Sequence, residues 1–164
     1  MDMISTADLH DAFPTEVMVL EAQFRSFGTV MRFCGPCETI RAFEDHRPVR
    51  SAAEAPGDGR VLVIDAAGSL RFGVIGGGIA EAALRNGWAG AVVFGAIRDS
   101  TEIAALRWGI KALGTTARRA ERAVGGLAGV PLECASATIH PGDWVYADED
   151  AVLIARRSLI SRAD

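Results

Sequence analysis

The sequence has few of the features that mark proteins for a membrane, for export or for nucleic acid. Its longest apolar or glycine run, residues 89–97, is about half of the ~20 residues that a membrane-spanning helix needs. The amino-terminal residues include early acids and no apolar stretch, so no secretory signal is visible. The net charge of −4 has the wrong sign for binding through phosphate contacts. We therefore expect a cytoplasmic protein that binds neither a membrane nor, directly, nucleic acid.

Cysteine and lysine are scarce as well. Three cysteines without a visible export signal indicate a reducing compartment rather than a disulfide framework. Of the 17 basic residues only Lys111 is a lysine, so Schiff-base chemistry has one candidate. Lys111 lies in an apolar stretch without an obvious acid–base partner. We expect its stem to pack while its amine reaches water.

The length and the hydrophobic pattern predict one α/β domain. A chain of 164 residues, 49% hydrophobic, can bury a core without disulfides or a metal. Residues 61–65 and 91–94 are typical of buried strands, and residues 79–86 are typical of a helix that ends at Gly87. A strand, a helix and a strand in this order predict a parallel pair. We expect a single domain over residues 1–164.

Shorter elements flank this unit. Ser5 can cap a helix that runs to Phe13, and residues 130–155 are typical of short strands joined by tight turns. The acidic run 148–150 is expected to form a solvated turn. Three arginines at helical spacing are expected to form a solvated face: Arg118, Arg119 and Arg122.

Cys34-Gly35-Pro36-Cys37 has the spacing of a redox motif. Redox chemistry of this kind needs the first cysteine at the start of a helix. Residues 38–43 instead alternate and include β-branched side chains, which is typical of a strand. We expect a turn between two strands here, with no redox role for Cys34 and Cys37.

Three consecutive glycines, residues 76–78, lead into the predicted helix. A dinucleotide fingerprint would need a small residue in place of Glu81 and a strand that ends closer to the glycines than Asp65. Glycines at a helix N-terminus leave backbone N–H groups bare at its positive end, which suits a small anion such as a carboxylate. The alternative is a flexible turn that binds nothing.

Arg98 and Asp99 follow the second predicted strand, at the edge where α/β sheets expose ligand-binding groups. Arg98 offers a positive fork to a carboxylate or a developing oxyanion. Asp99 can hold a hard divalent cation such as Mg²⁺. Alternatively, Asp99 caps the next helix and Glu102 completes a capping box. The three histidines show neither metal-ligand spacing nor a catalytic partner: His10, His46 and His140.

Seven stretches of the sequence, taken together, have a pattern in common with a known family. They are Gln23-x-x-Ser26-Phe27-Gly28, Phe43-Glu44-Asp45, residues 61–65, Asn86-Gly87-Trp88-Ala89-Gly90, residues 95–99, residues 109–115 and residues 141–148. The chain resembles, over about residues 6–158, the regulator of ribonuclease activity A family, which also contains the 4-hydroxy-4-methyl-2-oxoglutarate aldolases.

The resemblance implies a swivelling-type, phosphohistidine-domain-like ββα sandwich with a mixed sheet, assembled as a homotrimer with active sites at subunit interfaces. It implies that Asp99 holds a divalent cation, usually magnesium, and that Arg98 contacts the oxygen of a pyruvyl substrate. It also implies that backbone amides cradle the substrate carboxylate, at Gly76, Gly77, Gly78 and Ile79. With the resemblance included, the metal interpretation of Asp99 overtakes the cap.

One departure falls within this site. The catalytic members carry an aspartate at the position of Gly77, where it is thought to orient a water that acts in proton transfer. Retro-aldol cleavage needs a base for the hydroxyl proton of the substrate, whereas oxaloacetate decarboxylation does not. Losing the acid should therefore damage aldol cleavage more, and Gly77→Asp should raise aldol cleavage more than decarboxylation.

The expected function is a magnesium-dependent lyase on small 2-oxo acids, with Arg98 as its catalytic residue and Asp99 as its metal ligand. The alternative is a non-catalytic protein that binds and inhibits a ribonuclease.

Overall fold

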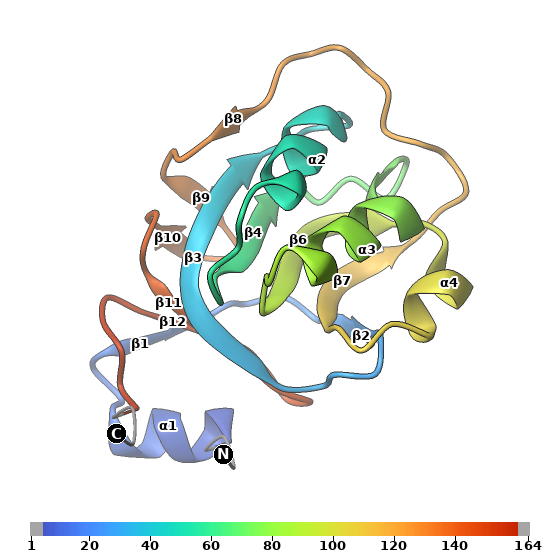
Figure 1. The fold of residues 1–164 in the computed structure, drawn as a ribbon. Helices are drawn as coiled ribbons and strands as arrows, with labels where there is room; N and C mark the ends of the chain where they lie inside the picture. The colour runs from blue at the N-terminus through green and yellow to red at the C-terminus, as the bar shows by residue number, and fades with distance from the viewer. Residues whose placement is uncertain (1–4, 161–164) are drawn as a thin grey trace.

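Four parallel strands form the centre of the molecule. The computed structural model describes residues 5–160. The four strands lie side by side in the order β3 (Phe33–Arg41), β4 (Val61–Asp65), β6 (Gly90–Ile97) and β7 (Ile110–Thr115), as Figure 1 shows. Residues 61–64 are at most 2% exposed, which is typical of parallel strands covered on both faces. The two predicted buried strands and their parallel pairing are thus confirmed.

Helices cover one face of these strands (Figure 1). They are α2 (Arg47–Glu54) and α3 (Gly77–Arg85), with the short α4 (Ser100–Ala104) next to them. The prediction for α3 is confirmed, and Gly87 follows its end with a φ of 77°. The sequence analysis missed α2, because only Val49 and Ala53 of its eight residues are buried apolar side chains.

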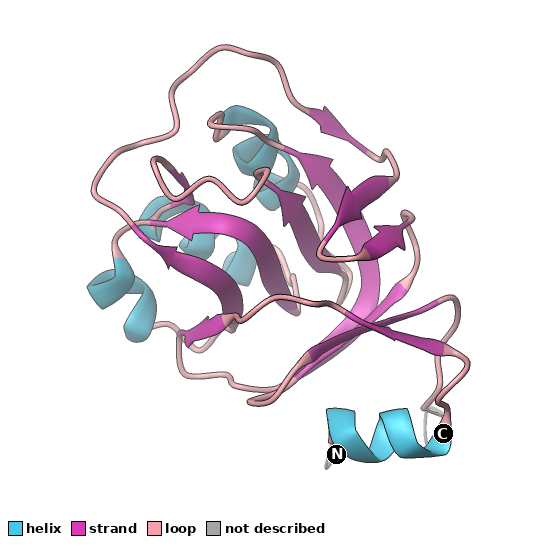
Figure 2. Ribbon diagram, turned by 180° about the vertical axis from the view of Figure 1, so that it is seen from behind, coloured by secondary structure: helices cyan, strands magenta, loops and turns pink. Residues whose placement is uncertain are grey.

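Antiparallel strands cover the opposite face, as Figure 2 shows from behind. Beyond the first half of β3 come β11 (Trp144–Ala147), β12 (Val152–Ala155) and β1 (Val17–Val19), and β9 (Leu132–Cys134) pairs separately with β10 (Ala137–Ile139). Three short strands complete the sheet: β2 (Arg25–Phe27), β5 (Gly73–Ile75) and β8 (Leu127–Ala128). The apolar core therefore has two parts, one on each face of the parallel strands. This is the expected α/β fold with a mixed sheet.

A short helix, α1 (Thr6–Ala12), packs outside these layers. Ser5 caps it, because the backbone N–H of Asp8 donates to Ser5 Oγ at 3.1 Å, as predicted. Leu9 packs with Tyr146 and Leu153 in a third apolar cluster. Among the described residues, no helix is long and apolar enough to cross a membrane.

The expected turn at residues 34–37 is wrong, because β3 runs through all four residues. Pro36 is tolerated because β3 changes partners there: residues 33–36 pair with β11 and residues 37–41 with β4. Cys34 and Cys37 are three positions apart and thus lie on opposite faces of the strand, in separate apolar clusters. Burial raises the pKa of the Cys37 thiol to about 12. This geometry disfavours thiol–disulfide chemistry between the two cysteines.

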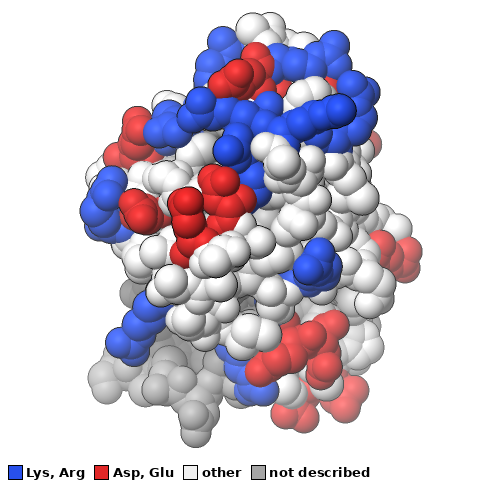
Figure 3. Space-filling view, turned by 90° about the vertical axis from the view of Figure 1, so that its right-hand side faces the viewer, with Lys and Arg blue, Asp and Glu red and all other residues white. Residues whose placement is uncertain are grey.

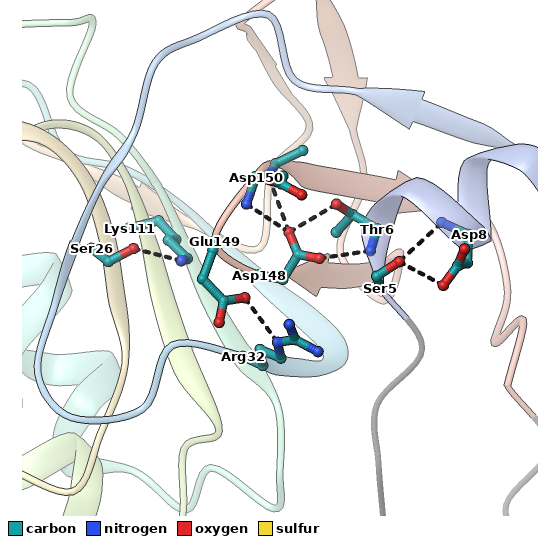
Figure 4. Close-up of polar contacts among 10 residues, drawn as sticks. Ser5, Thr6, Asp8, Ser26, Arg32, Lys111, Asp148, Glu149 and Asp150 are labelled. Carbon is teal, nitrogen blue, oxygen red and sulfur yellow. Dashed lines mark hydrogen bonds and ion pairs between the residues drawn. The ribbon is translucent and has the colours of Figure 1, made fainter.

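Lys111 and Asp148 were expected to reach solvent, but both are buried. Figure 4 shows their hydrogen bonds. Lys111 is 2% exposed, its Nζ donates to Ser26 Oγ at 2.7 Å, and burial lowers its pKa. Asp148 is 3% exposed, although it begins the acidic run. Its carboxylate accepts hydrogen bonds from Thr6 N, Thr6 Oγ1, Asp150 N and Ala151 N at 2.7 to 3.1 Å. These four residues are called the Asp148 cluster below, and they join α1 to the β11–β12 turn.

Candidate functional site

A small pocket lies where β5 and β6 end and α3 begins. Its volume is about 140 Å³. Five of the residues singled out from the sequence line it: Gly76, Gly78, Ile79, Arg98 and Asp99. Gly77 does not, although its two neighbours do. The edge of the sheet predicted to bind a ligand therefore holds a cavity of the size of a small organic acid.

The backbone turns sharply at Asp99, which has a left-handed φ of 58° and ψ of 40°. Aspartate tolerates this conformation better than most residues. Because of this turn, the Asp99 carboxylate points back toward α3 and does not cap α4. Its Oδ2 accepts the N–H of Gly77 at 3.0 Å, and its Oδ1 accepts Arg98 Nε at 3.2 Å. The capping alternative is therefore wrong.

Electrostatics keep the Asp99 carboxylate ionised. The Gly77 N–H and the Arg98 guanidinium hold the pKa of Asp99 below its ordinary value, although partial burial opposes them. A carboxylate has about four lone-pair sites, and these two contacts occupy two of them. Asp99 thus keeps capacity to bind a cation.

The glycines at the start of α3 permit this close approach. A Cβ at Gly76 would lie 2.6 Å from Asp99 Oδ2, and a Cβ at Gly77 would overlap Glu102 Oε2. A Cβ at Gly78 would meet open space. The backbone at Gly77 is not left-handed, and the atom that a Cβ there would overlap belongs to the flexible end of Glu102.

The N-terminus of α3 offers free hydrogen-bond donors to the pocket. Within residues 5–160, the backbone N–H groups of Gly78 and Ile79 have no partner. The N–H of Gly77 is already bound to Asp99, so Gly77 positions Asp99 and is not available to a ligand. Bare N–H groups at the positive end of a helix suit a carboxylate.

Arg98 is held by one hydrogen bond from its backbone and one from its side chain. Its backbone N–H donates to the carbonyl of Ile75 at 2.8 Å, and its Nε donates to Asp99. In the described part of the chain, its two terminal nitrogens make no hydrogen bond. Arg98 can therefore present both of them to an anion in the pocket.

Two further arginines, Arg50 from α2 and Arg119 from the segment after β7, also line the pocket. This segment forms a loop, although its arginines have helical spacing; Arg118, Arg119 and Arg122 are exposed, as expected of a solvated face. The N–H of Gly73 donates to the carbonyl of Arg118 at 2.8 Å, and the N–H of Ala120 donates to the carbonyl of Gly73 at 3.2 Å. Figure 3 shows a band of basic side chains beside a group of acidic ones on the face that carries α4 and β7.

The buried Glu44 anchors the same loop. Its carboxylate accepts Arg122 at 2.8 Å and Ser69 Oγ at 3.1 Å. Burial raises the pKa of Glu44, but hydrogen bonds from Arg122 and Ser69 and the charge of Arg71 outweigh burial and lower it overall. Arg119 thus lies in the pocket on a loop that hydrogen bonds to Glu44 and Gly73 hold in place. Nothing in the local sequence indicates this, because the partners are distant along the chain.

His46 is the functional candidate that the sequence analysis set aside. It precedes α2, is half-buried and lines the pocket. Its Nδ1 lies 2.7 Å from the carbonyl oxygen of Ala120, which also accepts the backbone N–H of His46 at 2.8 Å. A carbonyl can only accept, so Nδ1 carries the proton and Nε2 of the neutral ring is the acceptor. The partner of His46 is therefore a backbone carbonyl, which a search for spaced side chains in the sequence could not find.

Asp99 fits a magnesium ion but not a cation that demands many protein ligands. In the part of the chain that the structure describes, no group of three His, Cys, Asp or Glu side chains could hold a metal. Magnesium commonly takes one or two carboxylates and keeps several waters. Asp99, ionised and with free lone pairs, matches that pattern.

The chain matches one family model, described as RraA-like: Aldolase/RraA, over residues 6–154. It belongs to the Aldolase/RraA family. A relative from Alkalilimnicola ehrlichii named "Putative 4-hydroxy-4-methyl-2-oxoglutarate aldolase" is 44% identical over 157 residues, which cover 96% of this chain and 98% of that protein. The resemblance seen in the sequence is confirmed.

Two solved structures have the same fold. One, from Geobacillus kaustophilus, is titled S-adenosylmethionine: 2-dimethylmenaquinone methyltransferase; it is 39% identical with a TM-score of 0.93, over 98% of this chain and 100% of that one. The other is titled the RNA-processing inhibitor RraA from Thermus thermophilus; it is 38% identical with a TM-score of 0.92, over 97% of this chain and 96% of that one. The names of these Aldolase/RraA relatives differ in function, so the chemistry of the site must decide between them.

Proposed function

We propose that this protein is a divalent-metal-assisted carbon–carbon lyase that acts on small 2-oxo acids. The observation that carries the proposal is the convergence of three kinds of group on one pocket. These are the free N–H groups at the start of α3, the terminal nitrogens of Arg98 and the ionised carboxylate of Asp99. Anion binding, oxyanion stabilisation and cation binding are the three functions that such a lyase needs.

The charge of the pocket favours a substrate with two carboxylates. Arg50, Arg98 and Arg119 face a single lining carboxylate, that of Asp99. Oxaloacetate and 4-hydroxy-4-methyl-2-oxoglutarate both carry a 2-oxo acid group and a second carboxylate. We assign the 2-oxo acid group to the start of α3 and Arg98, and the second carboxylate to Arg50 and Arg119.

Magnesium, held by Asp99 and waters, would supply positive charge to the 2-oxo acid group. The protein groups do the rest. The N–H groups of Gly78 and Ile79 bind the adjacent carboxylate, and Gly77 keeps Asp99 in position. Arg98 hydrogen-bonds the carbonyl oxygen on which negative charge develops when the carbon–carbon bond breaks, and so stabilises the enolate.

An oxaloacetate decarboxylation assay tests the proposal directly. Pyruvate formation should require Mg²⁺, and chelation should abolish it. Aldol cleavage of 4-hydroxy-4-methyl-2-oxoglutarate is the second assay, and Gly77→Asp remains expected to raise it more than decarboxylation. If wild-type protein forms no pyruvate from either substrate with Mg²⁺, the proposal is wrong.

A non-catalytic role as a ribonuclease regulator is the second candidate. It is favoured by the likeness to the RNA-processing inhibitor from Thermus thermophilus and by the lack of an acid at Gly77. Inhibition of an RNA-processing ribonuclease by stoichiometric amounts of this protein, combined with no lyase activity, would support it.

We also propose that the protein works as a homotrimer, as the family resemblance implies, with sites at subunit interfaces. In the described part of the chain, six large apolar side chains are exposed and available for such contacts: Val19, Met31, Phe43, Leu70, Val124 and Leu127. Sedimentation equilibrium should give about three times the chain mass of 17.3 kDa. A monomer that is fully active would exclude the trimer as the working form.

A further inference from the structure

The proposed aldol reaction needs a group that takes the hydroxyl proton of the substrate, and Gly77 has no side chain to do so. Asp99 is a poor candidate, because Gly77 and Arg98 hold its carboxylate in hydrogen bonds that favour the charged form. Glu102 fills the space that a side chain at Gly77 would occupy. However, Glu102 does not line the pocket.

His46 lines the pocket together with Arg98 and Asp99. The carbonyl of Ala120 accepts both its backbone N–H and its Nδ1–H, so the ring and its tautomer are fixed. No hydrogen bond of Nε2 is formed within residues 5–160. A base whose other nitrogen is held by an orienting partner is the arrangement expected of a general base. Gly78 lines the same pocket, and a Cβ there would meet no atom within 4 Å, so the pocket is open at the start of α3.

We propose that His46 is the general base of aldol cleavage in this chain and takes over the proton transfer that position 77 cannot provide. The inference rests on the proposed function. It extends that function by naming the general base, a role that neither Gly77 nor the Arg98-Asp99 pair can fill.

The proton balance is complete within the site. Nε2 of His46 takes the proton of the C4 hydroxyl group, and the C4–O bond becomes a carbonyl as the C3–C4 bond breaks. The electron pair of that bond moves to the C2 oxygen, so the first product is the enolate of pyruvate facing Arg98. The proton on His46 then returns to C3 and gives the second pyruvate. Oxaloacetate decarboxylation skips the first of these transfers, since carbon dioxide leaves without loss of a proton.

His46→Asn is the decisive variant. The side-chain amide of asparagine can replace Nδ1 as the donor to Ala120, but it has no counterpart of Nε2. We expect kcat for aldol cleavage to fall by about 10²-fold or more, which is the typical range of general-base assistance. Decarboxylation should fall far less. The matched control is His10→Asn, which makes the same change on the exposed face of α1 and should alter neither reaction.

A second variant separates chemistry from structure. His46→Ala should lose aldol cleavage in the same way, and free imidazole should restore part of it in a saturable manner. Melting temperatures of both His46 variants show whether they fold.

The outcomes are distinct. The assignment of His46 is overturned if His46→Asn keeps wild-type aldol cleavage, if both reactions fall equally, or if Glu102→Gln alone removes aldol cleavage. Wild-type protein that decarboxylates oxaloacetate but never cleaves the aldol substrate also overturns it. Each of these results leaves the lyase proposal standing, which fails only if the wild-type protein acts on neither substrate.

Discussion

Asp148 and Asp99 each follow the end of a strand and accept backbone hydrogen bonds, but they differ in burial and in how many donors they have. Asp148 is 3% exposed, and four donors of the Asp148 cluster saturate its carboxylate (Figure 4). The side chain of Asp99 is 30% exposed, and within residues 5–160 only Gly77 and Arg98 donate to it. A saturated, buried carboxylate stabilises the fold, whereas a half-exposed one with free lone pairs can bind a ligand.

Arg98, beside Asp99, likewise has hydrogen-bonding groups without partners among the described residues. Arg98 keeps two terminal nitrogens free among the described residues, whereas Arg47 gives both Nε and Nη2 to the buried Asp45. Substitutions in the pocket should therefore reduce activity and leave stability nearly unchanged. Substitutions in the Asp148 cluster should do the reverse.

The largest expected effect is that of Arg98→Ala. It should lower kcat for oxaloacetate decarboxylation by about 10³-fold, because an oxyanion donor in a preorganised site is typically worth ~10²–10³. A coupled assay for pyruvate measures it, and thermal unfolding should show little change. Arg107→Ala, at an exposed position, is the control. Wild-type rates in Arg98→Ala would place the reaction elsewhere.

Asp148→Ala should have the second largest effect, and on stability. Removing the carboxylate leaves buried donors without partners, at about 1–3 kcal/mol for each unsatisfied group. We expect a loss of about 3 kcal/mol in the free energy of unfolding, measured by urea titration at pH 7. Asp150→Ala, which removes an exposed side chain next to it, should stay within about 0.5 kcal/mol of wild type. Equal losses in both variants would show that the turn, not the buried carboxylate, matters.

The Asp148 effect should also depend on pH. Burial raises the pKa of Asp148, but hydrogen bonds from Thr6, Ala151 and Asp150 outweigh burial and hold it below its ordinary value of 3.8. A carboxyl with a lowered folded-state pKa stabilises the fold fully above its unfolded pKa, and this contribution is lost as the pH falls through the folded value. The difference between wild type and Asp148→Ala should therefore shrink below about pH 4. A constant difference would contradict the low pKa.

Asp99→Asn tests the metal assignment with a smaller expected effect. The amide keeps the shape of the side chain and loses the charge. The Mg²⁺ concentration for half-maximal decarboxylation should rise by at least about 10–100-fold, because loss of a residue that only hydrogen-bonds to a metal ligand typically weakens metal binding by that much. Mn²⁺ binding followed by electron paramagnetic resonance gives an independent measure. Unaltered metal binding would remove Asp99 from the metal site.

The double variant Cys34→Ala/Cys37→Ala should have the smallest effect. Decarboxylation should persist, and the lost packing of the buried Cys37 should cost about 1 kcal/mol of stability. Loss of activity in the double variant, together with a titratable disulfide in wild type, would contradict the opposite-face geometry of β3.

The local pattern of the sequence was enough to predict part of this fold and site. The buried runs 61–65 and 91–94 indicated parallel strands, and Gly87 indicated the end of α3, because each signal lies within a few residues. Arg98 and Asp99 could be placed at the pocket from their position after a strand. The resemblance to a family added the expected role of each.

The remaining features depend on contacts between distant residues. His46 is held in the pocket by the carbonyl of Ala120, which is distant in the sequence. Arg119 is held there because the residues on either side of it, Arg118 and Ala120, hydrogen-bond to Gly73. Asp148 is buried because Thr6 donates to it from 142 positions away. Residues 34–37 look like a turn but form a strand, since close packing of Gly35 against the backbone of Gly59 requires a glycine there.

The bond between Thr6 and Asp148 also predicts an order of folding. The parallel strands and their helices can assemble from neighbours in the chain, whereas α1 and β1 find their partners only at β11 and β12. During synthesis α1 and β1 therefore stay unpaired until β11 and β12 have emerged. Contacts of such long sequence separation form slowly because the chain must close a large loop first. We therefore expect α1 and β1 to be among the last of the described elements to pair.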